Sequence, residues 1–167
     1  SSDLAMDAEF GKPAGFAKEG KDIALVYIDN PTELAGFQVS ADGWNQAGID
    51  VTDEMRALFK PGCVIEIAYK CTDPVWLVNI SSDANPNPAG TWLRGINGET
   101  YVPTGYVSTD GSVVQYTYEQ LVEFWGEGWE NTIVTLQAEG KDAWQVYSVK
   151  VGQQSNYRTL GSATELE

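Results

Sequence analysis

The alternation of apolar and polar positions predicts a chain built from short β-strands. Residues 63–71 are the clearest case, an alternating segment bounded by two cysteines. Further strands, separated by turn signals rich in Gly, Pro, Asn and Asp, are predicted at 22–29, 36–41, 47–51, 75–80, 91–96, 99–107, 112–117, 132–138 and 144–151. Short helices are predicted at 52–60 and 118–125. The pattern is typical of an all-β fold, an antiparallel β-sandwich of jelly-roll type with two short helices.

The predicted strands occupy the middle of the chain, and its length of 167 residues corresponds to one domain. Residues 1–20 are polar and contain several glycines, so they are interpreted as a lead-in segment. The sandwich is expected over 21–152, followed by a polar tail at 153–167. The sequence has no run of 18 apolar residues, so no membrane-spanning segment is predicted. We interpret the chain as a fragment of a larger protein.

Charge and composition exclude several classes of function. The chain contains no His and has a net charge of −14. The absence of His excludes Ser-His-Asp and Cys-His nucleophile systems and His-ligated zinc. Nucleic acids and anionic membranes are bound through Lys and Arg patches, so neither is expected as a partner. A neutral ligand fits this charge better.

The two cysteines are expected to be free thiols. If Cys63 and Cys71 bound a single strand, their Cα atoms would lie about 26 Å apart, at about 3.3 Å per residue. A disulfide requires a separation below about 7 Å. The spacing therefore predicts no bridge between them.

Tryptophan is the least ordinary feature of the composition, with six Trp among 167 residues. In 91–96, Leu93 is the better core residue, which predicts that Trp92 and Arg94 face outward. The same parity argument places Trp144 outward in the last strand. Parity does not place Trp76, which lies in a strand that is apolar on both faces.

The remaining tryptophans are assigned from their local context. Trp44 lies in a predicted turn, where full burial is less expected. Trp125 ends an apolar helix face and is assigned to the core. Trp129 lies in a Gly-rich loop and is open between core and surface.

Polar side chains accompany the outward aromatic ones. Strand parity places Gln38, Gln115 and Gln137 outward, so one sheet face or its rim could combine indole rings with Arg and Gln. That set suits a sugar, whose apolar C–H faces stack on indole while its hydroxyls need polar partners. The alternative is that these residues cover a sheet face packed by the N-terminal segment.

The order and spacing of several segments resemble a known family of modules. The segments are Gly43-Trp44-Asn45-Gln46-Ala47, Val64–Tyr69, Thr91-Trp92-Leu93, Gln115–Val122 and Trp144–Val151. Over residues 36–152 the chain resembles non-catalytic carbohydrate-binding modules of bacterial plant-cell-wall-degrading enzymes and cellulosomes, of the β-sandwich families 65, 79 and 80. The resemblance implies binding of neutral plant β-glucans (cellulose, xyloglucan or mixed-linkage glucan) by surface Trp residues.

Together, the parity argument and the resemblance give the expected carbohydrate site: Trp44, Trp76, Trp92, Arg94, Gln115, Trp129 and Trp144. The resemblance further implies a secreted, extracellular module, appended to a catalytic or dockerin module and acting as a monomer. No catalytic residue and no cofactor are expected. Two turns, Ser82–Asn85 and Thr109–Gly111, supply oxygen atoms for a structural Ca²⁺, but they lack EF-hand spacing.

The alternative function is a small jelly-roll glycoside hydrolase acting on β-glucan. Such an enzyme needs two carboxylates, about 5–5.5 Å apart for retention or 6.5–9.5 Å for inversion. Glu66 faces outward in its predicted strand, but no second Glu stands opposite it with outward parity. The sequence therefore favours a binding module over an enzyme.

Overall fold

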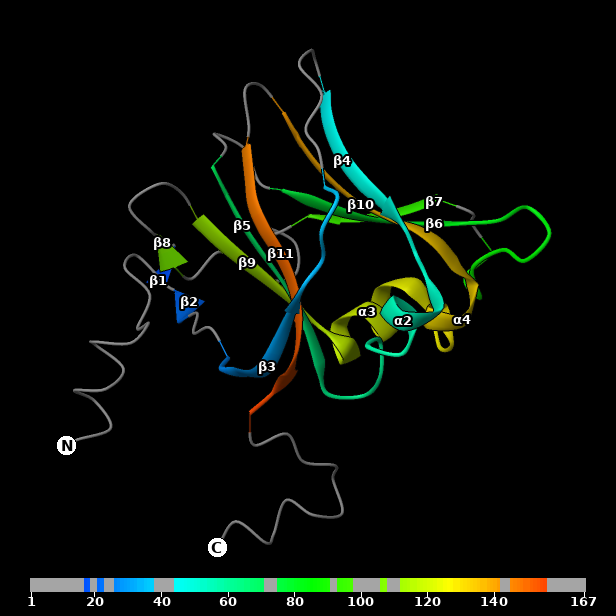
Figure 1. Cartoon of the computed structure of the whole chain (residues 1–167), viewed down its shortest axis with the longest axis horizontal. Coiled ribbons are helices and arrows are strands. Elements are labelled where there is room, and N and C mark those ends of the chain that lie inside the picture. Colours follow the sequence, from blue (N-terminus) through cyan, green and yellow to red (C-terminus); the bar gives the residue numbers. More distant parts are fainter. Residues whose placement is uncertain are drawn as a thin grey trace, which may run out of the picture.

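Two antiparallel sheets face each other, and three short helices lie together at one end of them (Figure 1). This computed structural model describes residues 17–18, 21–22, 26–37, 44–70, 75–90, 93–97, 106–107, 112–141 and 145–155. One sheet has four strands in the order β4-β10-β6-β7, and the other has five in the order β3-β11-β5-β9-β8. The predicted antiparallel β-sandwich is confirmed.

The elements follow the chain in a simple order, with a small separate hairpin before the sandwich. The hairpin is β1 (Ala17–Lys18) with β2 (Lys21–Asp22). The sandwich strands are β3 (Ile28–Glu33), β4 (Trp44–Asp50), β5 (Cys63–Lys70), β6 (Trp76–Ser81), β7 (Leu93–Asn97), β8 (Tyr106–Val107), β9 (Ser112–Thr117), β10 (Ile133–Lys141) and β11 (Gln145–Gln154). The helices are α2 (Asp53–Arg56), α3 (Tyr118–Trp125) and α4 (Trp129–Thr132).

The core lies between the two sheets and is formed by alternate residues of their facing strands. Ile65 and Ile67 of β5 oppose Leu77 of β6 and Leu136 of β10, and all four are fully buried. Tyr116 ties the layers together, because its hydroxyl donates to the Val75 carbonyl oxygen at 3.1 Å. Burial of this apolar surface supplies most of the driving force for folding.

The helical end of the sandwich holds an aromatic cluster. Helix α3 begins at a capping box in which Thr117 and Gln120 satisfy each other's backbone N–H groups. It ends at Gly126, whose positive φ turns the chain back into α4, a helix that the sequence pattern did not predict. This reversal places Trp129 against Trp125 in an edge-on contact, with ring centroids 5.0 Å apart.

Several strand boundaries differ from the prediction. The first strand was expected to end before Asn30 and Pro31, but β3 runs through both. Because β3 is an edge strand, the missing N–H of Pro31 costs the sheet little. Trp44 was expected in a turn and instead begins β4, opposite Lys141 of β10.

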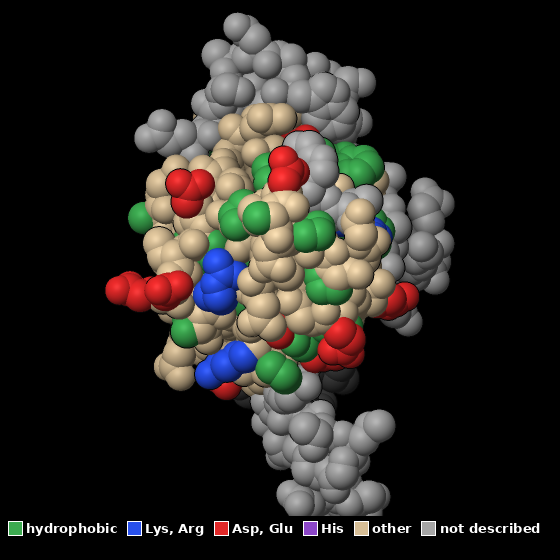
Figure 2. Space-filling model, turned by 90° about the vertical axis from the view of Figure 1, so that its right-hand side faces the viewer, with side chains coloured by type: hydrophobic (Ala, Val, Ile, Leu, Met, Phe, Trp, Pro, Cys, Tyr) green, Lys and Arg blue, Asp and Glu red, His purple; other side chains and the backbone are tan. Residues whose placement is uncertain are grey.

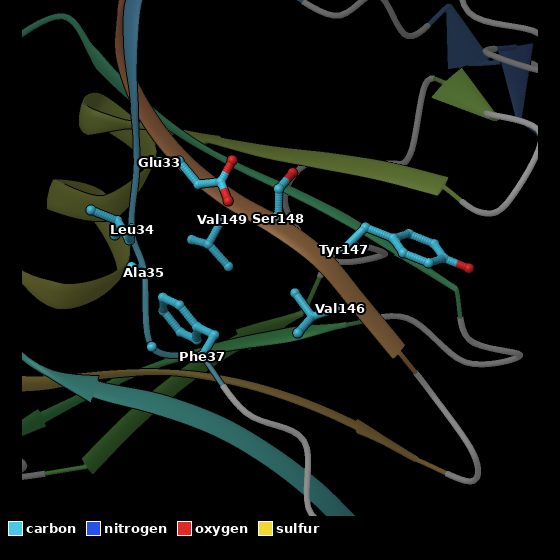
Figure 3. A pocket seen from close by; sticks show the side chains of 9 residues that line it. Glu33, Leu34, Ala35, Phe37, Val146, Tyr147, Ser148 and Val149 are labelled. Carbon is cyan, nitrogen blue, oxygen red and sulfur yellow. The ribbon is translucent and has the colours of Figure 1, made fainter.

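The connection after β3 closes one open side of the sandwich. Leu34 donates its backbone N–H to the Val149 carbonyl oxygen at 2.8 Å, and the described part of the expected strand at 36–41 is not a strand. A small pocket lies between this connection and β11. Within it Phe37, Val146 and Val149 point toward one another, whereas Tyr147 points away (Figure 3). Glu33 and Ser148 also line the pocket, and its accessible surface is mostly polar.

Candidate functional site

The outer face of the four-stranded sheet carries a register row with little side-chain bulk at both ends. Gly48 of β4 pairs with Gln137 of β10, which pairs with Val78 of β6, which pairs with Gly95 of β7. With strands about 4.8 Å apart, this row runs about 14 Å across the sheet. Gly48 leaves the β4 end of the row open to a ligand, whereas the space above Gly95 at the β7 end is occupied by the neighbouring Trp76 ring.

Two further register rows lie on either side of this one, on the same face of the sheet. One consists of Gln46, Glu139, Trp76 and Asn97, and the other of Asp50, Thr135, Ile80 and Leu93. Among them Leu93 is 46% exposed, and Gln46 and Asp50 are also exposed. The face thus combines apolar side chains on β6 and β7 with amides and carboxylates on β4 and β10.

Trp76 lies across this face rather than standing on it. A Cβ atom placed on Gly95 would lie 3.3 Å from Cε3 and 3.8 Å from Cζ3 of the Trp76 indole. The ring therefore reaches diagonally from β6 over β7 and occupies the space that a side chain at position 95 would fill. Trp76 is half-buried, so part of the indole stays accessible to a ligand. Strand parity had left this residue unplaced, and the structure puts it on the outer face.

The polar side chains of this face are linked to one another. The Nε2 of Gln137 donates to Oε2 of Glu139. The hydroxyl of Thr135 donates to Oδ1 of Asp50 at 3.4 Å. These pairs order the polar groups before any ligand arrives.

The prediction that Arg94 faces outward is wrong, because the parity of its strand is reversed. Leu93 is exposed, while Arg94 shares its side of β7 with the buried Ile96. Its Nη2 donates to the Phe124 carbonyl oxygen at 2.6 Å, and its guanidinium lies 5.1 Å from the centroid of the Phe124 ring. Arg94 therefore anchors the end of α3.

Gln115 is also not on an open face. It lies on the outer side of the five-stranded sheet as predicted, but it is only 3% exposed. Its amide accepts a hydrogen bond from the Val26 backbone N–H at 2.9 Å and donates to the Val26 carbonyl oxygen at 3.0 Å. Gln115 is therefore covered, because Val26, just before β3, lies over that part of the sheet face.

Trp129 was open between core and surface, and the structure places it in the core. Trp125 and Trp129 are both fully buried. Phe59 lies 5.2 Å and Tyr118 6.1 Å from the Trp129 ring, measured between centroids. An enclosed ring cannot stack on a sugar, so Trp129 is not part of the proposed carbohydrate site.

Two of the remaining tryptophans lie outside the described residues, namely Trp92 and Trp144. Strand parity no longer supports an outward position for either. The outward placement of Trp92 required Leu93 to face inward, but Leu93 is exposed. The outward placement of Trp144 required Tyr147 to face inward, but Tyr147 is 44% exposed beside a register shift between Val146 and Ser148.

Among the described residues, the titratable groups with shifted pKa values lie in the core or pack against it. Burial raises the pKa of the Cys63 thiol to about 12, and Cys63 is a free, buried cysteine as predicted. Cys71 lies outside the described residues. Burial likewise raises the pKa of Tyr116, and of Tyr118, whose hydroxyl also donates to Glu130 Oε1 at 2.9 Å. Each shift favours the neutral form.

The two turns that offered oxygen atoms for a structural Ca²⁺ lie only partly within the described residues. In the Ser82–Asn85 turn, the Asn85 backbone N–H donates to the Ser82 hydroxyl at 3.0 Å, so the turn is held by its own hydrogen bond. Thr109–Gly111 lies outside the described residues. No group of three or more His, Cys, Asp or Glu side chains that could hold a metal ion occurs among the described residues.

Charge and hydropathy add two observations. Acidic side chains lie scattered over the face in Figure 2, and only a few basic ones appear on it.

No helix within the described ranges is long and apolar enough to cross a membrane.

Comparison with known protein families identifies the family of this chain. The family model described as "Carbohydrate binding module 65 domain 1" matches residues 34–149, which is more than half of the chain. No curated protein and no solved structure matches the chain.

Proposed function

This chain belongs to carbohydrate-binding module family 65, and from that membership we propose that the outer face of its four-stranded sheet binds neutral plant β-glucans. Cellulose, xyloglucan and mixed-linkage glucan are the proposed ligands. The contact combines stacking on indole with hydrogen bonds to amide side chains. Its role is to hold an appended enzyme at its polysaccharide substrate.

The observation that carries this proposal is the indole of Trp76 lying over Gly95. The indole is half-buried on the outer face, so part of it is accessible there, and the apolar C–H faces of a pyranose stack on such a ring. Exposed Gln46, and Gln137 of the adjacent row, supply amide donors and acceptors for sugar hydroxyls. The carboxylates of Asp50 and Glu139 favour neutral glucans over acidic polymers such as pectin.

Trp44 is the second proposed stacking residue. It begins β4 and has the same strand parity as Gln46 and Gly48, two positions of the outer face. Trp92 and Trp144 remain in the proposal on the strength of the sequence resemblance alone.

The module is proposed to be non-catalytic, since membership of a carbohydrate-binding family and the placement of carboxylates both point that way. Glu139 and Asp50 lie four residues apart in register, which separates them by about 13 Å along the strands, beyond the 6.5–9.5 Å of an inverting pair. On the other sheet, Glu66 is flanked by Gln115 and Lys150. A small glycoside hydrolase is the alternative, and release of reducing sugar from a β-glucan by the purified chain would establish it.

The wider setting follows from the family. Carbohydrate-binding modules are typically extracellular parts of larger enzymes. We therefore propose a secreted, monomeric module that accompanies a catalytic or dockerin module and requires no cofactor.

Affinity electrophoresis through gels containing xyloglucan, barley β-glucan or hydroxyethylcellulose tests the proposed site. Trp76→Ala should abolish retardation, because loss of a central aromatic contact typically costs about 2 kcal/mol or more, some thirtyfold in affinity. Tyr147→Ala is the matched control, since Tyr147 is an exposed aromatic residue of the other sheet. Full retardation of Trp76→Ala would show that this face is not the site.

A further inference from the structure

Glu139 has an unusual place on the proposed glucan-binding face. It lies two residues from Gln137 on β10, so both side chains project from the same side of the sheet. The Gln137 Nε2 donates to the Glu139 carboxylate, and both residues are half-buried. The Glu139 carboxylate therefore accepts a hydrogen bond from another protein side chain, and it lies in the same register row as Trp76.

This hydrogen bond fixes which end of the Gln137 amide faces a ligand. A glutamine amide carries a donor and an acceptor of nearly equal size, and rotation by a half-turn exchanges them. With Nε2 on the carboxylate, the Oε1 is turned toward β4, where it lies 3.4 Å from the position that a Cβ atom on Gly48 would occupy. The opposite rotamer would bring the amide oxygen against carboxylate oxygen, which is repulsive.

We infer that Glu139 is a positioning residue, which holds Gln137 as a hydrogen-bond acceptor over Gly48 for a donating sugar hydroxyl. The inference rests on the proposed function, because it takes the outer face of the four-stranded sheet as the glucan site. Gly48 is essential to it, since the absence of a side chain there leaves the Gln137 Oε1 approachable. The Gln137 Oε1 would therefore select a ligand that presents a free hydroxyl group above Gly48.

Four variants test the inference by isothermal titration calorimetry with hydroxyethylcellulose or barley β-glucan. Glu139→Ala frees the amide and should weaken binding about three- to tenfold, the range of one hydrogen bond. Glu139→Gln still accepts the bond from Gln137 and should stay within about threefold of the unmodified chain. Gly48→Ala places a methyl group beside the Gln137 Oε1 and should also weaken binding. Glu123→Gln, an exposed carboxylate on α3, is the control and should change nothing.

A double-mutant cycle separates positioning from a direct contact of Glu139 with sugar. If Glu139 acts through Gln137, then Glu139→Ala should have less than about a twofold effect in a Gln137→Ala background. Full additivity of the two losses would overturn the inference. So would an unchanged affinity of Glu139→Ala in a chain where Trp76→Ala abolishes binding, and in that case the proposed function would stand. Unimpaired binding by Trp76→Ala would overturn both.

Discussion

Gln115, which the sequence had placed in the carbohydrate site, instead forms three hydrogen bonds that hold the fold together, and its removal gives a sharp test of the structure. Its amide forms two bonds with the Val26 backbone, one accepted and one donated, and so replaces the strand partner that Val26 would otherwise need. A third bond runs from its Nε2 to the Glu66 Oε1 at 2.8 Å. Gln115 thereby holds Val26 against the outer side of the five-stranded sheet.

The cost of Gln115→Ala follows from these three bonds. Each neutral hydrogen bond contributes about 1 kcal/mol net, and a bond to a charged group contributes about 1.5–3 kcal/mol. Allowing for partial exposure of Val26 and Glu66, we expect the free energy of unfolding to fall by about 3 kcal/mol. For a protein of this size that corresponds to a decrease in Tm of roughly 6–12 °C. Gln115→Glu should be at least as damaging, because it replaces the donor by a carboxylate facing Glu66 and the Val26 carbonyl.

Urea denaturation followed by tryptophan fluorescence measures this change, since Trp125 and Trp129 are fully buried and report on unfolding. Gln145→Ala is the matched control, an exposed Gln on β11 of the same sheet, and should stay within about 0.5 kcal/mol of the unmodified chain. Glucan affinity of Gln115→Ala should be unchanged, because the substitution lies on the other sheet. If Gln115→Ala unfolds at the same urea concentration as Gln145→Ala, the role assigned to the three bonds is incorrect.

Two further predictions concern residues that the structure assigns to the core side. Arg94→Ala should lower the free energy of unfolding by about 2 kcal/mol through loss of its charged bond to the Phe124 carbonyl, while glucan affinity stays within about twofold; weakened binding at unchanged stability would contradict this assignment. In a Cys71→Ser background, alkylation of Cys63 at pH 8 should be about a thousandfold slower in the folded chain than in the urea-unfolded chain. Burial raises the pKa of Cys63 from 9.0 to about 12, and each pKa unit lowers the thiolate fraction about tenfold. Because the folded pKa lies above the unfolded one, the stability linked to this thiol is present below pH 9 and is lost as pH rises from about 9 toward 12. Rapid native alkylation would show that Cys63 is accessible.

The elements with strong local signals were predicted closely from sequence. Helix α3 was predicted with its observed bounds, because Thr117 caps it and Gly126 ends it. Strand β5 was predicted between its two cysteines, since its apolar face is continuous. Helix α4 was missed because its four residues carry no periodic signal, and the burial of its Trp129 depends in part on Phe59, which is distant in sequence.

The candidate site was less predictable, because strand parity is lost wherever a strand shifts register. A register shift between Val146 and Ser148 of β11 inserts one residue, so Tyr147 turns outward although Val149 and Val151 face the core. A second shift, between Ile133 and Thr135 of β10, exposes Val134 in the same way. Neither register shift is marked by a Gly or Pro in the sequence.

Trp76 illustrates the complementary limit, since its placement depends on a residue in another strand. Both faces of β6 are apolar, so periodicity alone assigns the indole to neither side. The outer position becomes available because Gly95, in the neighbouring strand, has no side chain where the ring must lie. A glycine in a sheet often marks close approach of another group, and here its role becomes visible only once the β6–β7 register is known. A glycine on one strand that lies diagonally opposite a tryptophan on the next is therefore a pairing worth seeking in sequence, because it predicts a ring lying along a sheet.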